Sequence, residues 1–402
     1  MTAHLPLTVA ARELSGATLQ APQRHVLTAP DWLAAEAPMD SECWLLPALI
    51  DAGVHLREPG MSHKASIASE CHAALRNGIT RMVSAPDTQP CVDTTAVVEY
   101  VLERARRAGS AAVHPIAALT KGLGEEGLSE MGALAAAGCV AFGNLGRPLG
   151  NTLLLRRALQ YAASLDLLVV LQPVERWLGE EGCAHEGPVA QRLGLPGIPE
   201  SAETLALARD LMLLEETGVR GHIARISCAR SVEMIAAAKA RGLRLSCDVA
   251  MHQLFFSEID LMGFDAHHHV LPPYRSNRDR EALRAGVASG VIDCIVSDHS
   301  PHDRDAKLAP FPGAEPGISG LDSFLGLGLK LVADGVLALP RWLDACSAAP
   351  ARIFGLPGPG RMLVSPHASS RLQPEQMHSR GRNTPFAGWP LAGHVKAVWM
   401  SA

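Results

Sequence analysis

Short apolar segments recur along most of the chain and alternate with segments that have helical spacing. The apolar segments cover 45–51, 79–85, 111–117, 138–143, 167–172, 221–226, 243–248 and 291–297. Between most of them lie stretches rich in Ala, Leu, Arg and Glu, for example 64–77, 92–107, 152–164, 201–217 and 229–241. Eight repeats of a buried strand followed by a helix predict a parallel (β/α)8 barrel of the TIM-barrel type, an α/β fold.

A doubly wound open sheet is the main alternative for this alternating pattern. Such a sheet often carries a Gly-x-Gly-x-x-Gly turn after its first strand, and this chain has none there. The two ends of the chain lack the rhythm and consist of short extended pieces. We therefore expect a barrel over 45–356, with 1–44 and 357–402 together forming a small β appendage.

Two long insertions interrupt the predicted barrel. Residues 173–200 follow the fifth strand and residues 299–318 follow the eighth, on the face where barrels build their sites. Both are candidate lids or partner-contact loops. The histidine run 267–269 is interpreted as a solvated loop, because adjacent histidines in an extended segment point apart.

Composition narrows the possible partners and the compartment. The 402 residues are 48% hydrophobic and 19% charged, as in a globular protein with a large core. A net charge of −5 gives no reason to expect nucleic acid or an anionic membrane surface. No apolar run reaches the ~18–20 residues of a membrane span, and no signal peptide is visible. Nine scattered cysteines without a Cys-x-x-Cys pair favour a reducing cytoplasm.

Polar side chains stand at the predicted carboxyl ends of most strands. The first run leads into Asp51, Gly53, His55 and Arg57, and then breaks at Pro-Gly. The other strand ends supply Asp87, Asn144, Gln172, Arg225, Asp248 with His252, and the segment 298–302. Because the carboxyl ends of barrel strands converge, we expect the functional site to be a cavity at that face.

Several of these motifs resemble those of the dihydroorotases of the amidohydrolase superfamily. Residues 51–60 resemble Asp-x-His-x-His-Leu-Arg-x-Pro-Gly, and 85–90 are similar to Met-Pro-Asn-Thr-x-Pro. Further matches are Gly-Leu-Pro-Gly-Ile-Pro at 194–199, Leu-Pro-Pro-Tyr-Arg at 271–275, Ser-Asp-His-Ser-Pro-His at 297–302 and Asn-Thr-Pro-Phe-Ala-Gly-Trp at 383–389. Arg57, rather than an asparagine, favours a dihydroorotase over the related allantoinases.

The resemblance implies the reversible closure of N-carbamoyl-aspartate to dihydroorotate. In that family zinc polarises the amide carbonyl and lowers the pKa of a bound water. The ligands are a His-x-His pair on strand one, an Asp or carboxylated Lys at strand four, a His on each of strands five and six, and an Asp on strand eight. That last position, Asp298 here, also shuttles the proton and is the retained catalytic position.

Four of the six ligand positions are vacated in this chain. They are occupied by Gly53, Asn144, Gln172 and Arg225, while His55 and Asp298 remain. Two ligands fall short of the three that a catalytic zinc normally takes, and a cationic Arg225 would repel a divalent ion. We therefore expect no metal cofactor. Rescue by His63, His252 or His299 is the alternative, and it would imply zinc.

The substrate-holding positions implied by the resemblance are mixed. Arg57, which would grip a substrate carboxylate, and His302 are retained. Asp87 stands where the family has Asn and would face an anionic substrate with a negative charge. Leu271 replaces a second Asn. We expect weak binding of the usual dianion.

Three functions remain open on this basis. The first is a catalytically inactive dihydroorotase-like subunit that assembles with the aspartate carbamoyltransferase catalytic chain, as other such chains of the family do, with self-association as an option. The second is an active zinc-dependent dihydroorotase or related cyclic amidohydrolase with an atypical metal site. The third is an anion sensor that uses Arg57. Because a buried carboxylate without a partner is costly, we also expect Arg225 to form a salt bridge with Asp298.

Overall fold

The eight predicted barrel strands form one parallel sheet in the computed structural model, which describes residues 7–28, 30–33 and 42–401. In spatial order they are β6 (Leu49–Val54), β7 (Ile79–Ser84), β8 (Ala112–Ala117), β9 (Ala141–Phe142), β10 (Leu168–Leu171), β13 (Arg220–Ile223), β14 (Leu245–Ala250) and β15 (Cys294–Val296). Sequence order and spatial order agree, as expected when each strand is followed by a crossover helix.

The sheet closes between its first and last strands. The backbone N–H of His55 donates to the His299 carbonyl at 2.8 Å, and the His299 N–H donates to the Gly53 carbonyl at 3.1 Å. The buried Asp51 carboxylate on β6 accepts hydrogen bonds from both the backbone N–H, at 3.0 Å, and the hydroxyl of Ser297. These contacts make the sheet a barrel and exclude the doubly wound alternative.

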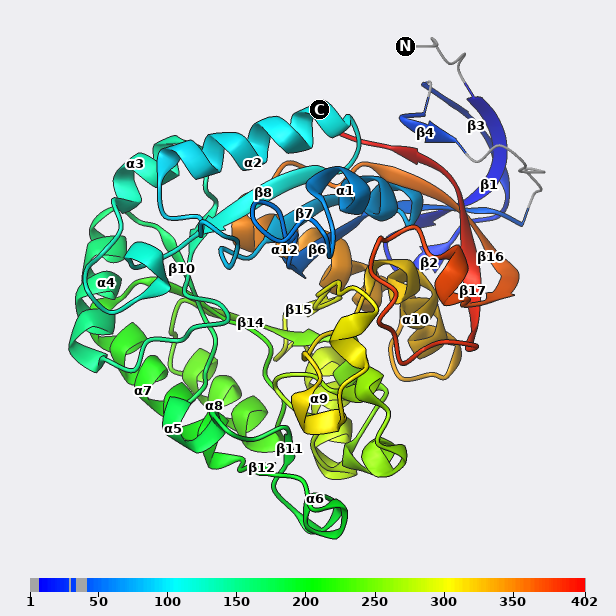
Figure 1. Cartoon of the computed structure of the whole chain (residues 1–402). Coiled ribbons are helices and arrows are strands. Elements are labelled where there is room, and N and C mark those ends of the chain that lie inside the picture. The colour runs from blue at the N-terminus through cyan, green and yellow to red at the C-terminus, as the bar shows by residue number, and fades with distance from the viewer. Residues whose placement is uncertain (1–6, 29, 34–41, 402) are drawn as a thin grey trace.

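Helices surround the barrel as an outer ring (Figure 1). They are α1 (Ile67–Arg76), α2 (Thr95–Ala108), α3 (Met131–Ala136), α4 (Thr152–Ser164), α7 (Ser201–Thr217), α8 (Ala229–Ala240), α9 (Asn277–Ser289), α10 (Leu321–Ala333) and α11 (Leu339–Leu343). The short α12 (Ala349–Phe354) instead packs Phe354 into the cluster of the barrel interior. Local signals fix several starts: Ser66 and Ser276 form capping boxes, and the Asn151 side chain accepts from Leu154 N–H. The helices predicted at 152–164 and 201–217 have those same bounds.

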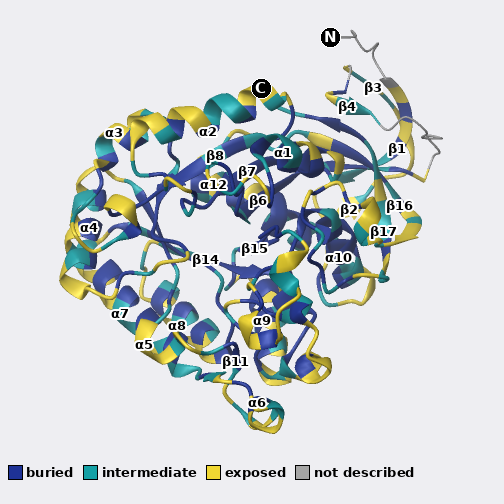
Figure 2. Ribbon diagram, viewed as in Figure 1, coloured by how far each residue is buried: buried dark blue, intermediate teal, exposed yellow. Residues whose placement is uncertain are grey.

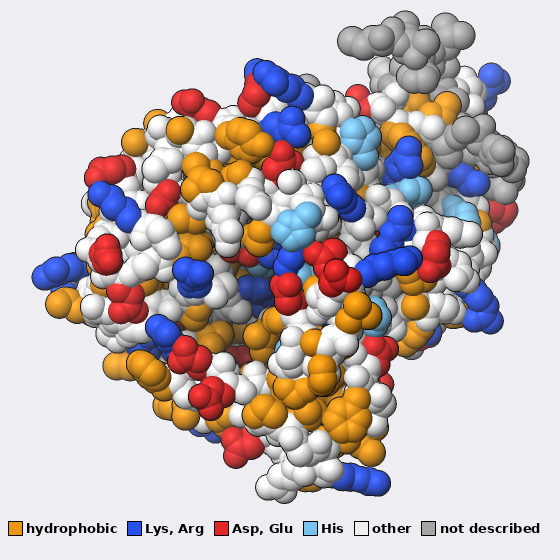
Figure 3. All heavy atoms as spheres, viewed as in Figure 1, with side chains coloured by type: hydrophobic (Ala, Val, Ile, Leu, Met, Phe, Trp, Pro, Cys, Tyr) orange, Lys and Arg blue, Asp and Glu red, His pale blue; other side chains and the backbone are white. Residues whose placement is uncertain are grey.

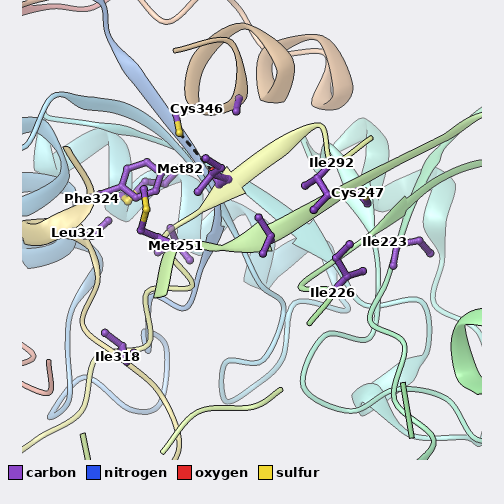
Figure 4. Packing of buried hydrophobic residues seen from close by; sticks show 14 of the residues in the cluster. Met82, Ile223, Ile226, Cys247, Met251, Ile292, Ile318, Leu321, Phe324 and Cys346 are labelled. Carbon is purple, nitrogen blue, oxygen red and sulfur yellow. Dashed lines mark hydrogen bonds between the residues drawn. The ribbon is translucent and has the colours of Figure 1, made fainter. Parts of the chain in front are cut away.

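The core lies inside the barrel and between the barrel and its helices. Figure 2 shows the strands almost entirely buried, whereas the helices are buried only on the inner side. Met82, Ile223 and Phe324 belong to the large cluster between strands and helices (Figure 4). A second cluster, with Val83, Val170 and Val296, fills the barrel interior. The cysteines are free thiols, and all but Cys91 are buried.

The two ends of the chain meet in a second sheet, as predicted. It contains β1 (Leu7–Ser15), β2 (Thr18–Leu19), β3 (Gln23–Leu27), β4 (Trp32–Leu33), β5 (Trp44–Pro47), β16 (Arg361–Arg371) and β17 (Pro390–Trp399). The apolar run 45–51 is therefore two strands, not one. It divides at Ala48, whose N–H donates to the Gly360 carbonyl at 3.2 Å, so that β5 joins the appendage sheet and β6 the barrel.

The predicted insertions carry short elements of their own. The first holds α5 (Arg176–Gly179), β11 (Ala184–His185), α6 (Pro188–Leu193) and β12 (Gly197–Ile198), and the second has 3-10 turns at Asp305–Lys307 and Phe311–Gly313. The expectation of a solvated loop at 267–269 is wrong for its last residue. His269 is buried and its Nδ1 lies 2.7 Å from the Ala314 carbonyl, which ties it to the second insertion.

Among the described residues, no helix is both long enough and apolar enough to cross a bilayer.

Candidate functional site

A cavity of about 290 Å³ opens at the carboxyl ends of the barrel strands, where the sequence predicts the site. Seven of the singled-out residues line it: His55, Arg57, Asp87, Gln172, Arg225, Leu271 and Asp298. Gly53 lies deeper, against a small space on the barrel axis. Neither Asn144 nor His302 lines the cavity.

The predicted salt bridge between Arg225 and Asp298 is confirmed. The Arg225 Nη1 donates to Asp298 Oδ1 at 2.8 Å and lies 3.3 Å from His55 Nε2. Its Nη2 donates to Gln172 Oε1 at 2.6 Å. One guanidinium therefore contacts three other positions at which the family resemblance places metal ligands.

Neighbouring charges keep this pair ionised in spite of its burial. Burial by itself raises the pKa of the Asp298 carboxyl, but Arg225 and His252 outweigh it, and the pKa lies below its ordinary value. Burial lowers the pKa of Arg225, but Asp298, Asp248 and Asp87 together raise it more, so that the net direction is upward. The bridge is a largely buried ion pair with good geometry, which is the condition under which such a pair compensates for its desolvation.

His55 connects this bridge to Asp87. Its Nδ1 lies 2.7 Å from Asp87 Oδ2. Because a guanidinium has only donors, His55 Nε2 must accept from Arg225, and Nδ1 must then carry the proton and donate to Asp87. The two contacts together define one tautomer of the imidazole.

Asp87 does not present an unbalanced charge to the cavity. Burial raises the pKa of its carboxyl, but His55 and Arg57 lower it further, to about 2. Arg57 Nη1 lies 3.4 Å from Asp87 Oδ2. The negative charge that the sequence sets against an anionic substrate is thus paired with the arginine expected to hold that substrate.

Arg57 is itself engaged by the protein. Its Nε donates to the Pro301 carbonyl at 3.3 Å, and its Nη2 donates to the Ser300 hydroxyl. His302 lies behind it, with Nε2 3.4 Å from the Arg57 Nη2 and Nδ1 3.2 Å from the Lys64 amine. Burial and these two cations lower the pKa of His302 to about 3. His302 contacts Arg57 from outside the lining of the cavity, and its substrate-binding role stays a prediction.

Two of the vacated positions, 53 and 144, cannot supply a ligand to the cavity. A Cβ added at Gly53 would lie 2.9 Å from Cβ and Cγ2 of Val296 on β15, so this position has no room for a histidine. Asn144 accepts from the Leu119 N–H at 3.0 Å and donates to Thr120 Oγ1 at 2.6 Å, away from the cavity. Its neighbour Leu145 is the residue after β9 that faces the barrel axis.

The residues present do not fit a zinc site. Within the part of the chain that the structure describes, no group of three or more His, Cys, Asp or Glu side chains could hold a metal ion. Of the possible rescue ligands, His63 is exposed beside Asp303 at 3.6 Å, and His299 is buried against Glu70 at 2.9 Å. Only His252 approaches the site, with Nε2 3.3 Å from Asp298 Oδ2 and a buried Nδ1 that has no partner.

Sequence reasoning missed two features of this site. Arg57, Arg225 and Asp298 have positive φ angles of 62°, 56° and 52°, a region that side chains other than glycine rarely adopt. The cavity wall also includes Arg275, whose Nη1 donates to the Ile198 carbonyl at 2.7 Å, and the buried Glu203. No periodicity or spacing in the sequence predicts these backbone angles. Arg275, in contrast, could have been found, because it is the last residue of the motif at 271–275.

Comparison with known proteins identifies the family. The Dihydro-orotase-like family profile matches residues 43–231. A dihydroorotase-like protein of Pseudomonas aeruginosa is 47% identical over 92% of this chain and 89% of its own length. The chain belongs to the dihydroorotase-like family. Another dihydroorotase-like protein, from Pseudomonas putida, is 48% identical over 87% of this chain and 84% of its own, and a dihydroorotase of Syntrophotalea carbinolica is 42% identical over 88% and 85%.

Solved structures support the fold independently. The L-hydantoinase of Arthrobacter aurescens superposes with a TM-score of 0.81 over 98% of this chain and 94% of its own, at 19% sequence identity. A D-hydantoinase from a Thermus species gives a TM-score of 0.75 over 98% and 93%. The dihydroorotase-like chain therefore has the amidohydrolase barrel, with a cavity whose charged groups are paired with one another.

Proposed function

We propose that this dihydroorotase-like chain is a catalytically inactive member of its family that acts in the cytoplasm as a structural subunit for the aspartate carbamoyltransferase of pyrimidine biosynthesis. The observation that carries the proposal is the position of Arg225. Its guanidinium contacts His55 and Asp298, the two retained ligand positions, and forms a salt bridge with the carboxylate that would shuttle the proton.

A divalent ion at this position would have to displace a buried cation. Arg225 remains protonated at all accessible pH values, and its charge would repel a second cation in the same low-dielectric space. Without a metal, nothing in the cavity polarises an amide carbonyl in the way that this family requires. Asp298 is also unsuited to proton transfer at neutral pH, because its pKa lies below its ordinary value.

A structural role for the chain is supported by what surrounds the cavity. The barrel is closed, and the motif residues at 51–60 and 297–302 still form its seam. The substitutions affect the metal-ligand positions and leave the barrel intact. This pattern is consistent with selection for the fold and its surface. The partner itself comes from the family resemblance.

The decisive experiment is to co-express the chain with the aspartate carbamoyltransferase catalytic chain of the same organism. We expect the two to co-purify as one hetero-oligomer on a sizing column, with bound zinc far below one ion per chain. Dihydroorotate ring opening should stay at the background rate of a buffer blank. A catalytic chain that elutes alone, whether or not this chain is present, would contradict the proposed partnership.

The active-enzyme alternative predicts a different set of results. Stoichiometric zinc in purified protein, together with ring opening that is lost in Asp298→Ala, would overturn the inactive assignment. Because Asp298→Ala leaves Arg225 without its partner, the folded state of this variant should be verified by circular dichroism. Asp298→Asn, which keeps the side-chain shape, serves as the second variant.

A further inference from the structure

A second, larger hollow lies outside the barrel mouth, between the insertion after β15 and the segment that joins β16 to β17. Its volume is about 680 Å³. The residues that line this outer groove are His267, His302, Asp303, Arg304, Lys307, Leu308, Pro374, Glu375, Arg380, Arg382 and Asn383. Figure 3 shows Lys and Arg side chains beside Asp and Glu side chains over this part of the surface. None of the residues that line this groove also lines the cavity.

The groove carries an excess of positive charge that the protein does not neutralise. Arg304, Lys307, Arg380 and Arg382 face it, against Asp303 and Glu375. Within the described residues none of the four cations forms an ion pair, and Asp303 instead pairs with His63. Two charges in excess are notable in a chain whose net charge is −5.

The arginines keep most of their donors available. Arg380 Nη1 donates to the Ser62 carbonyl at 3.1 Å, and Arg382 Nη1 donates to the Pro374 carbonyl. Each contact fixes the direction of a guanidinium that has five N–H donors in total. Arg304 is exposed on the opposite wall. The planar forks of arginine match the oxygens of carboxylate and phosphate groups.

Lys307 gives the insertion wall a fixed shape. Its ammonium donates to the carbonyls of Ala266, at 3.1 Å, and Glu315 and lies 3.4 Å from the His269 carbonyl. The Gly317 N–H also donates to the His269 carbonyl, at 2.9 Å. The insertion is thus held against the segment 266–269, and the charge of Lys307 is fixed beside the groove.

An apolar strip accompanies the cations. Leu308 is 76% exposed, and Pro374 and the His267 ring lie on the same groove. A groove of this volume lies within the range of small-molecule sites, about 300–1,000 Å³.

From this arrangement we infer that the outer groove binds a small phosphorylated molecule with a flat ring, such as a nucleoside di- or triphosphate. The phosphate oxygens lie on Arg304, Arg380 and Arg382, and the ring lies on Leu308, Pro374 and His267. This inference does not depend on the proposed subunit role.

Calorimetric titration of the purified full-length chain with UTP, ATP and inorganic pyrophosphate tests the inference. We expect binding that weakens as salt increases and a nucleotide affinity above that of pyrophosphate, because only the nucleotide has a ring. Arg304→Gln and Arg380→Gln should each lower the affinity about tenfold, since a charge-assisted hydrogen bond contributes on that scale. Leu308→Ser should weaken nucleotide but not pyrophosphate binding.

Arg157→Gln is the matched control, because Arg157 is an exposed arginine on α4, outside the groove. It should leave the affinity unchanged. Absence of binding to all three probes would overturn the inference, as would equal losses in Arg157→Gln and Arg304→Gln. The groove could instead bind the acidic surface of a partner protein. Such binding would be unaffected by the three probes and lost in Arg380→Gln, and this result would also overturn the inference.

Discussion

The seam that closes the barrel and the cavity above it lie only a few residues apart, yet they differ in how many residues of the family motifs they retain. In the seam, Asp51 keeps the side chain of the family motif, Ser297 keeps a hydroxyl where the motif has Thr, and the two bond to each other in full burial. In the cavity, the ligand positions hold Gln172 and Arg225 instead of histidines. The seam cannot change one partner without leaving the other unsatisfied.

The cavity could change because one side chain replaced a whole set of contacts. Metal ligands without their ion would be a group of buried polar atoms with no partner. Arg225 provides donors to Asp298, His55 and Gln172 at once. Under the proposed function, the comparison teaches that a metal site can be lost without loss of stability when a cation of the protein's own takes over its electrostatic role.

Removing that cation should have the largest effect. We expect Arg225→Ala to lower the free energy of unfolding by about 3–5 kcal/mol, because Asp298 then remains as a buried charge without its main partner. Urea unfolding followed by circular dichroism measures the change. The double variant Arg225→Met/Asp298→Leu, which removes both charges, should recover most of the loss. Equal stability of Arg225→Ala and the parent would contradict the electrostatic role.

Restoring a single ligand should damage the fold without restoring a metal. Gly53→His places a side chain against Val296, where even a Cβ would approach to 2.9 Å. We expect a cost of about 1–3 kcal/mol from overpacking. Elemental analysis after incubation with zinc should show no added ion, since Arg225 remains. The companion Val296→Ala should relieve the clash; if Gly53→His alone is fully stable, the packing argument fails.

The sequence predicts the fold of this protein better than the arrangement of the side chains at its candidate site. Strand ends and motif glycines and prolines follow from local patterns, so the barrel and the appendage could be derived. The Arg225–Asp298 bridge could be inferred only because the family resemblance places both positions at one metal site. The split of the run 45–51 could not, because both halves are equally apolar and only the pairing partner of each strand separates them. The orientation of Asn144 was likewise invisible, since a two-residue strand gives no reliable alternation.

The electrostatic role of Asp87 could not be predicted from the sequence and is visible only in the structure. In the sequence it is a carboxylate opposed to an anionic substrate, whereas in the structure it pairs with His55 and Arg57. The residues come from different strand ends, and no spacing along the chain reports the distance between them. The same holds for His302, which contacts Arg57 from outside the cavity.

The pairing of Asp87 should appear in the response to acid. Its pKa is lowered from 3.8 to about 2, so the folded state binds protons less readily than the unfolded state. The stabilisation is therefore complete above the unfolded value and is lost as the pH falls towards 2. We expect Asp87→Asn to have a flatter dependence of stability on pH in this window than the parent. Parallel pH profiles for the two proteins would show that Asp87 is not held by its partners.

The smallest effect is expected for Gln172, which orients the bridge without carrying charge. Gln172→Ala removes the acceptor for Arg225 Nη2, at 2.6 Å, and for the Gly146 N–H, at 3.1 Å. Because Gln172 is only partly buried and water can reach these donors, we expect a loss of about 0.5–1.5 kcal/mol. The exposed Gln160→Ala on α4 is the control and should change stability by less than Gln172→Ala does. A Gln172→Ala loss comparable with that of Arg225→Ala would mean that the amide, not the ion pair, holds the cavity together.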